Sequence, residues 1–194
     1  HWLGFLRDND FLSPIESRVV DHNEAVLQYV TGMNTTKSYK LVALRSLLQG
    51  GTLTRPMGVS ELAQSSLRMV RRDPRLQADV TTKEIPDPDA VSQSRWLTYW
   101  RKWPLDHLAN DRAFGLSAES FGLSRPPAAE DDNALNDLLS ELVDWRMARY
   151  LVHKGFGDRI ELRVSHNQSQ PILRFDRSKY PSIPKGSAIP VDVG

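Results

Sequence analysis

Apolar residues between positions 35 and 75 recur with the period of an α-helix and predict two amphipathic helices joined by a short connection. In the first helix, Leu41, Leu44 and Leu48 are separated by three and four residues, so they share one face. The pair Gly50–Gly51 follows this helix. Because glycine readily adopts the left-handed backbone conformation found after many helices, we expect the first helix to end there.

The second predicted helix has an apolar face and an arginine face. Its apolar positions are Val59, Leu62, Ala63, Leu67 and Val70. At about 100° per residue, a roughly opposite sector contains Arg68, Arg71, Arg72 and Arg75. Ser60 is placed to cap the first turn. Two interpretations stay open, because such a face is either an ordinary solvated surface or a set of cations for nucleic-acid phosphates.

An aromatic stripe follows a polar loop that spans residues 81–94. Trp96, Trp100 and Trp103 are spaced by four and three residues, as on one face of a helix, and Arg101 and Lys102 lie beside them. Aromatic rings interleaved with cations can stack bases and contact phosphates in single-stranded nucleic acid. The alternative is that the stripe packs into the hydrophobic core, as aromatic residues at helical spacing commonly do.

Residues 113–124 alternate between apolar and polar positions and predict a β-hairpin. The residues expected to face one another are Phe114 and Leu116 on one strand, and Phe121 and Leu123 on the other. Helices followed by a hairpin have the element order of a winged-helix module. The sequence therefore predicts a winged-helix-like centre.

Residues 130–154 predict the longest helix. Acidic side chains favour its first turn, and they are Glu130, Asp131 and Asp132. Lys154 lies in its last turn, and Gly155 is expected to end it. Arg146 and Arg149 share the arc of the apolar residues. A buried guanidinium without a partner is costly, so this end is exposed to solvent, or the arginines meet carboxylates, or they meet an anionic ligand such as phosphate.

Beyond residue 158 the period of the pattern changes from helical to two. Ile160, Leu162 and Val164 alternate with charged residues, and residues 189–193 predict a final strand, so we expect a small antiparallel sheet at the C-terminus. The chain begins and ends within such patterns. We therefore interpret it as a fragment of a longer polypeptide, with the last sheet truncated.

The predicted fold class is α+β, mostly helical, with the winged-helix-like centre and the C-terminal sheet. Three segments are expected: a helical segment at 1–34, the winged-helix-like region at 35–124, and the long helix with the sheet at 125–194. The 194 residues are enough for a substantial core.

Composition adds limits on the chemistry. The net charge is +1, so a surface for nucleic acid must come from local segregation of charge. The chain has no cysteine, which excludes disulfides and thiolate zinc sites and fits the cytoplasm. No apolar run approaches the roughly 20 residues that cross a bilayer, so no membrane partner is expected.

Motifs for catalysis are absent from the sequence. It contains no phosphate-binding GxxxxGK[ST] or GxGxxG loop, no HExxH and no GxSxG, so we expect no cofactor, metal site or enzymatic activity in this chain itself. The stretch 158–163 is similar to the acidic strand of metal-dependent nucleases. Arg163 stands where those enzymes usually have lysine, and a guanidinium is a poor base. A nuclease activity that depends on Glu161 is therefore the third-ranked hypothesis.

Two stretches resemble a known family. TTKSYKLVALRSLL with VSELA, and IELRVSHNQSQPILRFDRSKYPSIPKG near the end, are similar to the C-terminal region of large bacterial superfamily 2 (DEAD/DEAH-box) helicase-like proteins, several of which belong to restriction or phage-defence systems. The resemblance covers roughly residues 30–194. It implies that ATP and magnesium act in RecA-like lobes elsewhere in the parent protein, so no catalytic residue is assigned here.

The sequence thus predicts an accessory DNA-binding module of a helicase-like ATPase that contacts the phosphate backbone. Phosphate contacts give affinity and register rather than sequence selection. The predicted contact residues are Arg68, Arg71, Arg72, Arg75, Arg101, Lys102, Arg146 and Arg149. The alternative is a protein-interaction domain that docks on the helicase lobes or on a nuclease subunit, with the arginines facing acidic partners.

Overall fold

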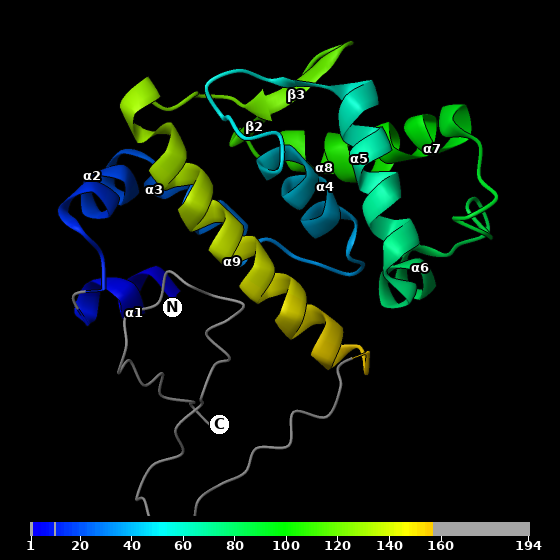
Figure 1. Ribbon diagram of the computed structural model, residues 1–194, viewed down its shortest axis with the longest axis horizontal. Helices are drawn as coiled ribbons and strands as arrows, with labels where there is room; N and C mark the ends of the chain where they lie inside the picture. Colours follow the sequence, from blue (N-terminus) through cyan, green and yellow to red (C-terminus); the bar gives the residue numbers. More distant parts are fainter. Residues whose placement is uncertain (1, 10, 157–194) are drawn as a thin grey trace, which may run out of the picture. The chain divides into compact units, whose positions relative to one another are not determined.

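Helices make up most of residues 2–9 and 11–156, the part of the chain that the computed structural model describes (Figure 1). The helices are α1 (Trp2–Asp8), α2 (Pro14–His22), α3 (Glu24–Gly32), α4 (Tyr39–Leu48), α5 (Val59–Arg72), α6 (Pro74–Val80), α7 (Gln93–Trp100), α8 (Asp106–Ala109) and α9 (Asp132–His153), with a π-helical turn η1 (Arg101–Leu105) and a 3-10 turn η2 (Ala129–Asp131). The strands are β1 (Met57–Gly58), β2 (Phe114–Leu116) and β3 (Ser120–Leu123). This confirms a mainly helical α+β class. The strands predicted after residue 158 lie outside the described residues.

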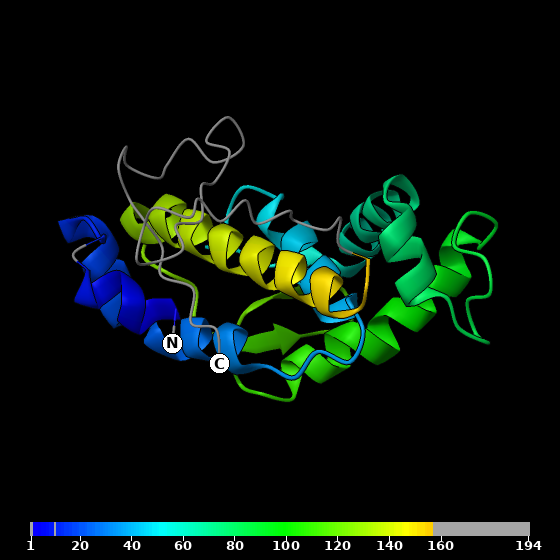
Figure 2. The same ribbon diagram turned by 90° about the horizontal axis from the view of Figure 1, so that it is seen from below.

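Helix α4 is at the centre of the packing. It contacts α5 and α9, and α9 crosses it diagonally (Figure 1). Seen from below, α9 and α5 lie on one side, and α3, the hairpin strands and α8 lie on the other (Figure 2). With neighbours around it, α4 buries more than the predicted stripe: Ala43 and Ser46, which lie outside it, are also fully buried.

One hydrophobic core joins helices from all three predicted segments. Val20 of α2, Leu41 of α4 and Leu142 of α9 belong to the same cluster of buried side chains. All of them fall within the compact unit His1–Phe156, while the division at positions 34 and 124 stays a prediction.

The predicted helix ends are confirmed at two glycines. Gly51, three residues after the last residue of α4, has φ +79°, and Gly155, two residues after the last residue of α9, has φ +78°. A side chain at either position would strain the backbone. At 22 residues α9 is the longest helix. Among the described helices, none combines the length and the apolar character needed to cross a membrane.

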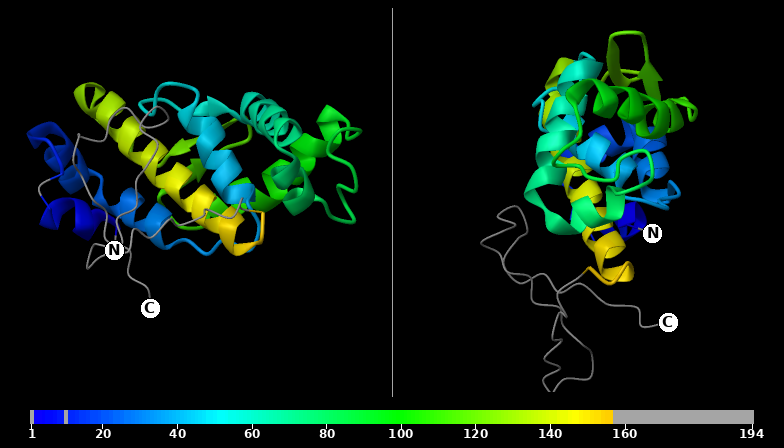
Figure 3. Two further views of the ribbon diagram at one scale, coloured as in Figure 1. Left: turned by 60° about the horizontal axis from the view of Figure 1, so that its bottom comes forward. Right: turned by 90° about the vertical axis from the view of Figure 1, so that its right-hand side faces the viewer.

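The sheet is antiparallel, with strand order β1-β3-β2. Phe114 pairs with Leu123 and Leu116 pairs with Phe121, which confirms the predicted hairpin. Strand β1 is too short for its pattern to be recognised in the sequence. It reaches β3 because residue 122 is glycine: a Cβ there would lie 2.9 Å from Cα of Pro56. The turn of the hairpin projects beyond the helices in the right-hand view of Figure 3.

The three tryptophans of the aromatic stripe do not share one environment in the structure. Trp96 and Trp100 are buried, and their rings stack with centroids 4.5 Å apart, so the core interpretation is confirmed for both. Trp103 instead has 37% of its surface exposed. It lies in η1, where the π-helical turn around Pro104 holds one residue more than an α-helical turn and so moves Trp103 off the core-facing side.

Buried Asp79 connects three helices. Its carboxylate accepts hydrogen bonds from the backbone N–H of Ser38, at 2.6 Å, and from the hydroxyl of Tyr150, at 2.7 Å. It therefore joins α6 to the start of α4 and to α9. Burial, together with this bond to Asp79, raises the pKa of Tyr150 above its ordinary value, so the hydroxyl stays protonated and donates.

Two of the three acidic residues at the start of α9, Asp131 and Asp132, turn inward, while Glu130 is exposed. Asp132 is 9% exposed, and its carboxylate accepts from the Leu53 N–H and the Thr52 hydroxyl, both at 2.6 Å. Asp131 accepts from the Arg18 guanidinium at 2.5 Å. The acidic run thus ties α9 to α2 and to the loop between α4 and β1, rather than only complementing the helix dipole.

The Arg18–Asp131 pair predicts a pH-dependent stability. The hydrogen bond from Arg18 holds the pKa of Asp131 below its ordinary value, and His22 acts in the same direction. A carboxyl with a depressed folded-state pKa contributes stability above about pH 4, and the contribution is lost as the pH falls through the folded pKa. We expect Arg18→Gln to lower the urea midpoint at neutral pH, and the difference from wild type to disappear near about pH 2. An equal difference at both pH values would attribute the effect to packing of the arginine side chain.

Candidate nucleic-acid interface

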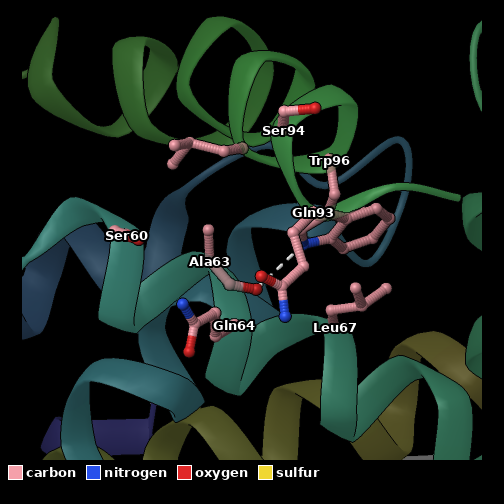
Figure 4. A pocket seen from close by; sticks show the side chains of 8 residues that line it. Ser60, Ala63, Gln64, Leu67, Gln93, Ser94 and Trp96 are labelled. Atoms are coloured by element: carbon pink, nitrogen blue, oxygen red, sulfur yellow. Dashed lines mark hydrogen bonds between the residues drawn. The ribbon is translucent and has the colours of Figure 1, made fainter.

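A groove of about 210 Å³ runs between α5 and α7 (Figure 4). Figure 4 shows Ser60, Ala63, Gln64 and Leu67 on α5, and Gln93, Ser94 and Trp96 on α7. The indole N–H of Trp96 donates to the carbonyl of Ala63 at 2.9 Å, so the two helices are tied together at the floor of the groove. Its edges carry side chains that donate and accept hydrogen bonds.

The groove continues toward the hairpin. A second hollow, of about 590 Å³, shares Ser60 and Leu97 with the first. It is further lined by Thr98, Arg101, Lys102, Asp106, Ala118 and Glu119. The two hollows together, here named the α5–α7 groove, extend from the middle of α5 to the hairpin turn.

One ridge of α5 carries exposed polar groups: Ser60 and Gln64 line the groove, and Arg68 and Arg72 continue the ridge beyond it. Ser60, Gln64, Arg68 and Arg72 follow one another at intervals of four residues, so they line one side of the helix, and all four are exposed. Among the described residues, neither Arg68 nor Arg72 has a hydrogen-bond or ion-pair partner. Their guanidinium groups are therefore available to an anionic ligand.

The other two arginines of the predicted face are engaged. Arg71 donates to the carbonyls of Pro88, Asp89 and Val91 at 2.9–3.2 Å and so holds the loop before α7 against α5. Arg75 makes a two-pronged contact with Asp73, at 2.8 and 3.0 Å.

The Asp73 carboxylate neutralises the charge of the Arg75 guanidinium. The contact with Arg75 holds the pKa of the Asp73 carboxyl below the ordinary value, so that carboxyl stays ionised opposite the guanidinium. The predicted four-arginine face thus contains two open cations and two that already have protein partners.

Arg101 and Lys102 both line the groove. Arg101 donates to the carbonyls of Ala118 and Ser117 at 2.6 and 2.7 Å, which fixes the hairpin turn against η1. Lys102 lies 3.8 Å from a carboxylate oxygen of Glu84, and its ammonium lies 4.7 Å from the centroid of the Trp103 ring. Both contacts of Lys102 are exposed, so they are weak and readily exchanged.

Arg146 and Arg149 lie on α9 and line no part of the groove. Arg146 donates to the carbonyls of Val30, Thr31 and Met33 at the end of α3. Burial, with the nearby charge of Arg149, lowers the pKa of Arg146. Carbonyl oxygens, rather than carboxylates or solvent, therefore satisfy this guanidinium, and they lie where a helix end favours positive charge. A phosphate contact by either arginine stays a prediction.

Several groove residues were not among the predicted contacts. Gln64, Gln93, Ser94 and Thr98 carry no charge, and the charge pattern alone drew attention only to basic positions. The sequence spacing could have identified Gln64 as part of the same polar ridge. This residue extends the series of Arg68 and Arg72 by one turn toward the N-terminus, so the polar ridge can be recognised from its spacing.

Comparison of the chain with protein-family models, with curated proteins and with solved structures finds no match. The resemblance to helicase-like proteins therefore stays a prediction. Within residues 2–9 and 11–156, no cluster of three histidine or acidic side chains is arranged to hold a metal ion.

Proposed function

We propose that residues 39–123 form a winged-helix-type module that binds duplex DNA as an accessory part of a helicase-like protein. The element order supports this: α4, β1, α5, α6, α7, the short η1–α8 segment and then the β2–β3 hairpin, with β1 paired to β3. In helix-turn-helix proteins, the second helix of the pair enters the major groove. Here α7 is that helix, and the hairpin is the wing.

The two faces of α7 fit this assignment. Trp96, Tyr99 and Trp100 are buried and anchor the helix on the core. Ser94 and Thr98 lie on the exposed side, one turn apart, and carry hydroxyl groups that can reach base edges. The connection from α5 is longer than an ordinary helix-turn-helix turn and includes α6. The contacts of Arg71 with Pro88 and its neighbours compensate, because they tie this connection to α5.

The observation that carries the proposal is the pair of open cations on α5. Among the described residues Arg68 and Arg72 have no protein partner, and they continue the ridge whose first residues, Ser60 and Gln64, line the groove shared with α7. Guanidinium groups on this neighbouring helix can contact backbone phosphates of a duplex that α7 enters, which sets the register of the protein on the duplex. With a net charge of only +1 on the whole chain, such a local concentration is what duplex binding requires.

The salt dependence of binding tests the proposal. We expect affinity for a short labelled duplex to fall steeply with salt, and Arg68→Gln/Arg72→Gln to reduce the slope of log K against log salt by about 1.8, at about 0.9 per phosphate contact. The affinity loss should be similar for unrelated duplex sequences. Fluorescence anisotropy at several salt concentrations measures both quantities.

A matched control is Lys83→Gln/Arg125→Gln, which removes two exposed cations outside the groove. It should leave the slope within error of wild type. If both double variants lower the slope equally, the attraction comes from overall charge and not from α5. Binding that does not respond to salt would overturn the DNA proposal and favour docking on a protein partner.

A further inference from the structure

A separate pocket of about 580 Å³ lies between residues 34–40 and the α7–η1–α8 segment. Turn η1 contributes Lys102 to the α5–α7 groove and Trp103 to this pocket, so the two sites adjoin along the chain. Its volume falls within the range of about 300–1,000 Å³ typical of small-molecule sites. Nothing in the proposed duplex contacts uses it.

One wall of this pocket, formed by Tyr99, Trp103 and His107, is aromatic. The Trp103 ring stacks with His107 at 5.7 Å between centroids, and Tyr99 lies 6.5 Å from Trp103. Tyr99 is in turn fixed by a 2.5 Å hydrogen bond to the hydroxyl of Tyr39. A large indole that is partly exposed yet held in place by its neighbours is a rigid surface on which a planar ligand can stack.

The opposite wall carries two positioned ammonium groups. Lys37 donates to the carbonyls of Asp79 and Thr81 at 2.7 and 3.0 Å, and Lys40 donates to the carbonyl of Asn34 at 3.2 Å. An ammonium has three donors, so each lysine keeps at least one. Carbonyl oxygens carry no net charge, and in the described part of the chain neither lysine forms a salt bridge.

We propose that this pocket binds a nucleotide, with the base stacked on Trp103 and the phosphate at Lys37 and Lys40. A simple anion would leave the aromatic wall unused, and an uncharged ring would leave the lysines unused. A heteroaromatic base that carries a phosphate uses both. The source is an unpaired nucleotide of a DNA strand or a free mononucleotide, and the first of these rests on the proposed duplex binding next to it.

Lys102 does not fix the Trp103 ring from the other hollow. Its ammonium lies 4.7 Å from the centroid of the ring, but its side chain is 59% exposed and its ion pair with Glu84 spans 3.8 Å. An exposed pair of this kind contributes little, so a base that approaches the ring can displace the lysine.

The test measures binding of the full chain to a short labelled oligodeoxyadenylate strand, with deoxyadenosine monophosphate as a competitor. Trp103→Ala should raise the dissociation constant on the order of tenfold or more, as expected for the loss of one stacked base. Trp145→Ala is the matched control: Trp145 is 39% exposed and lies beneath the Arg149 guanidinium at 5.5 Å, but lines no part of the pocket. It should leave the constant unchanged.

Lys40→Gln tests the phosphate contact. It should weaken binding of deoxyadenosine monophosphate but not of deoxyadenosine, with Lys83→Gln as the charge-matched control. The inference is overturned if Trp103→Ala and Trp145→Ala have equal effects, or if inorganic phosphate competes as well as the mononucleotide. If deoxyadenosine monophosphate displaces the strand, the natural ligand is a free nucleotide. If the strand binds and the mononucleotide does not displace it, the ligand is an unpaired nucleotide of a DNA strand. Either outcome supports nucleotide binding in this pocket.

Duplex binding is judged separately. Trp103→Ala should leave the affinity for a blunt duplex and its salt slope unchanged, because those depend on Arg68 and Arg72. A chain that binds the strand but no blunt duplex would refute the proposed function and leave the pocket standing. A chain that binds the blunt duplex but no strand or nucleotide would do the reverse.

Discussion

Replacing Trp100 by alanine lowers the free energy of unfolding by about 4 kcal/mol, because it removes a fully buried indole from the core. Trp100 is 0% exposed, stacks on Trp96 at 4.5 Å, and meets the Tyr39 ring edge-on at 5.9 Å. Removal of the indole leaves a cavity that the surrounding helices cannot close without losing these contacts. Urea denaturation followed by far-ultraviolet circular dichroism measures the change.

Two comparisons make this result specific. Trp103→Ala, three residues further along the same stripe, should cost less than about 1 kcal/mol, since its ring is partly in solvent. Trp100→Phe should also cost far less than alanine, because the indole N–H of Trp100 has no hydrogen-bond acceptor among the described residues and no bond is lost with it. Equal costs for Trp100→Ala and Trp103→Ala would contradict the burial that separates them.

Asp132→Ala is expected to lower the free energy of unfolding by about 3 kcal/mol. Its carboxylate is the acceptor for the buried N–H of Leu53 and for the hydroxyl of Thr52, both at 2.6 Å. Alanine would leave that N–H without a partner in a site closed to water, which costs more than the net value of the bonds themselves. Thermal and urea unfolding, followed by a spectroscopic probe in α9 and by far-ultraviolet circular dichroism of the whole chain, should show the same loss of stability.

Asp137→Ala provides the control on the same helix. Asp137 is exposed, and its replacement should change the stability by less than about 0.5 kcal/mol. Asp132→Asn should fall between the two, because the amide keeps one carbonyl acceptor and loses the negative charge. If Asp132→Ala were as mild as Asp137→Ala, the connection between the start of α9 and the loop before β1 would be energetically unimportant.

Much of the helical framework follows from local pattern. The leucine spacing of α4 and the apolar face of α5 predicted both helices, and the glycines at 51 and 155 marked ends that the structure confirms. The hairpin that brings Phe114 and Leu116 opposite Phe121 and Leu123 was also predictable. These features depend on neighbours within a few residues, where periodicity and backbone preferences dominate.

Features that depend on distant partners were not predictable. Ser60 was expected to cap α5, but the helix begins at Val59, whose N–H donates to the carbonyl of Glu119 at 2.8 Å. Trp103 was expected in the aromatic stripe, yet the π-helical turn at Pro104 turns it outward. In both cases a tertiary contact or an irregular turn overrides the local spacing.

The hydrogen-bond partners of three predicted contact residues explain why the sequence could not show which arginines are free to bind a ligand. Arg71, Arg101 and Arg146 all donate to main-chain carbonyls of other segments. Every residue type carries a carbonyl, so such a partner leaves no trace in the amino-acid sequence. A basic face can therefore be read from the sequence, but which of its members are free needs the fold.

The contact of Arg101 with the hairpin turn has an entropic consequence. Because the guanidinium holds the carbonyls of Ser117 and Ala118, the hairpin turn is fixed to η1. The turn therefore loses its conformational freedom when the chain folds. In the duplex binding proposed above it would meet the DNA as a preformed shape, so mutations that loosen the turn should raise the entropic cost of binding.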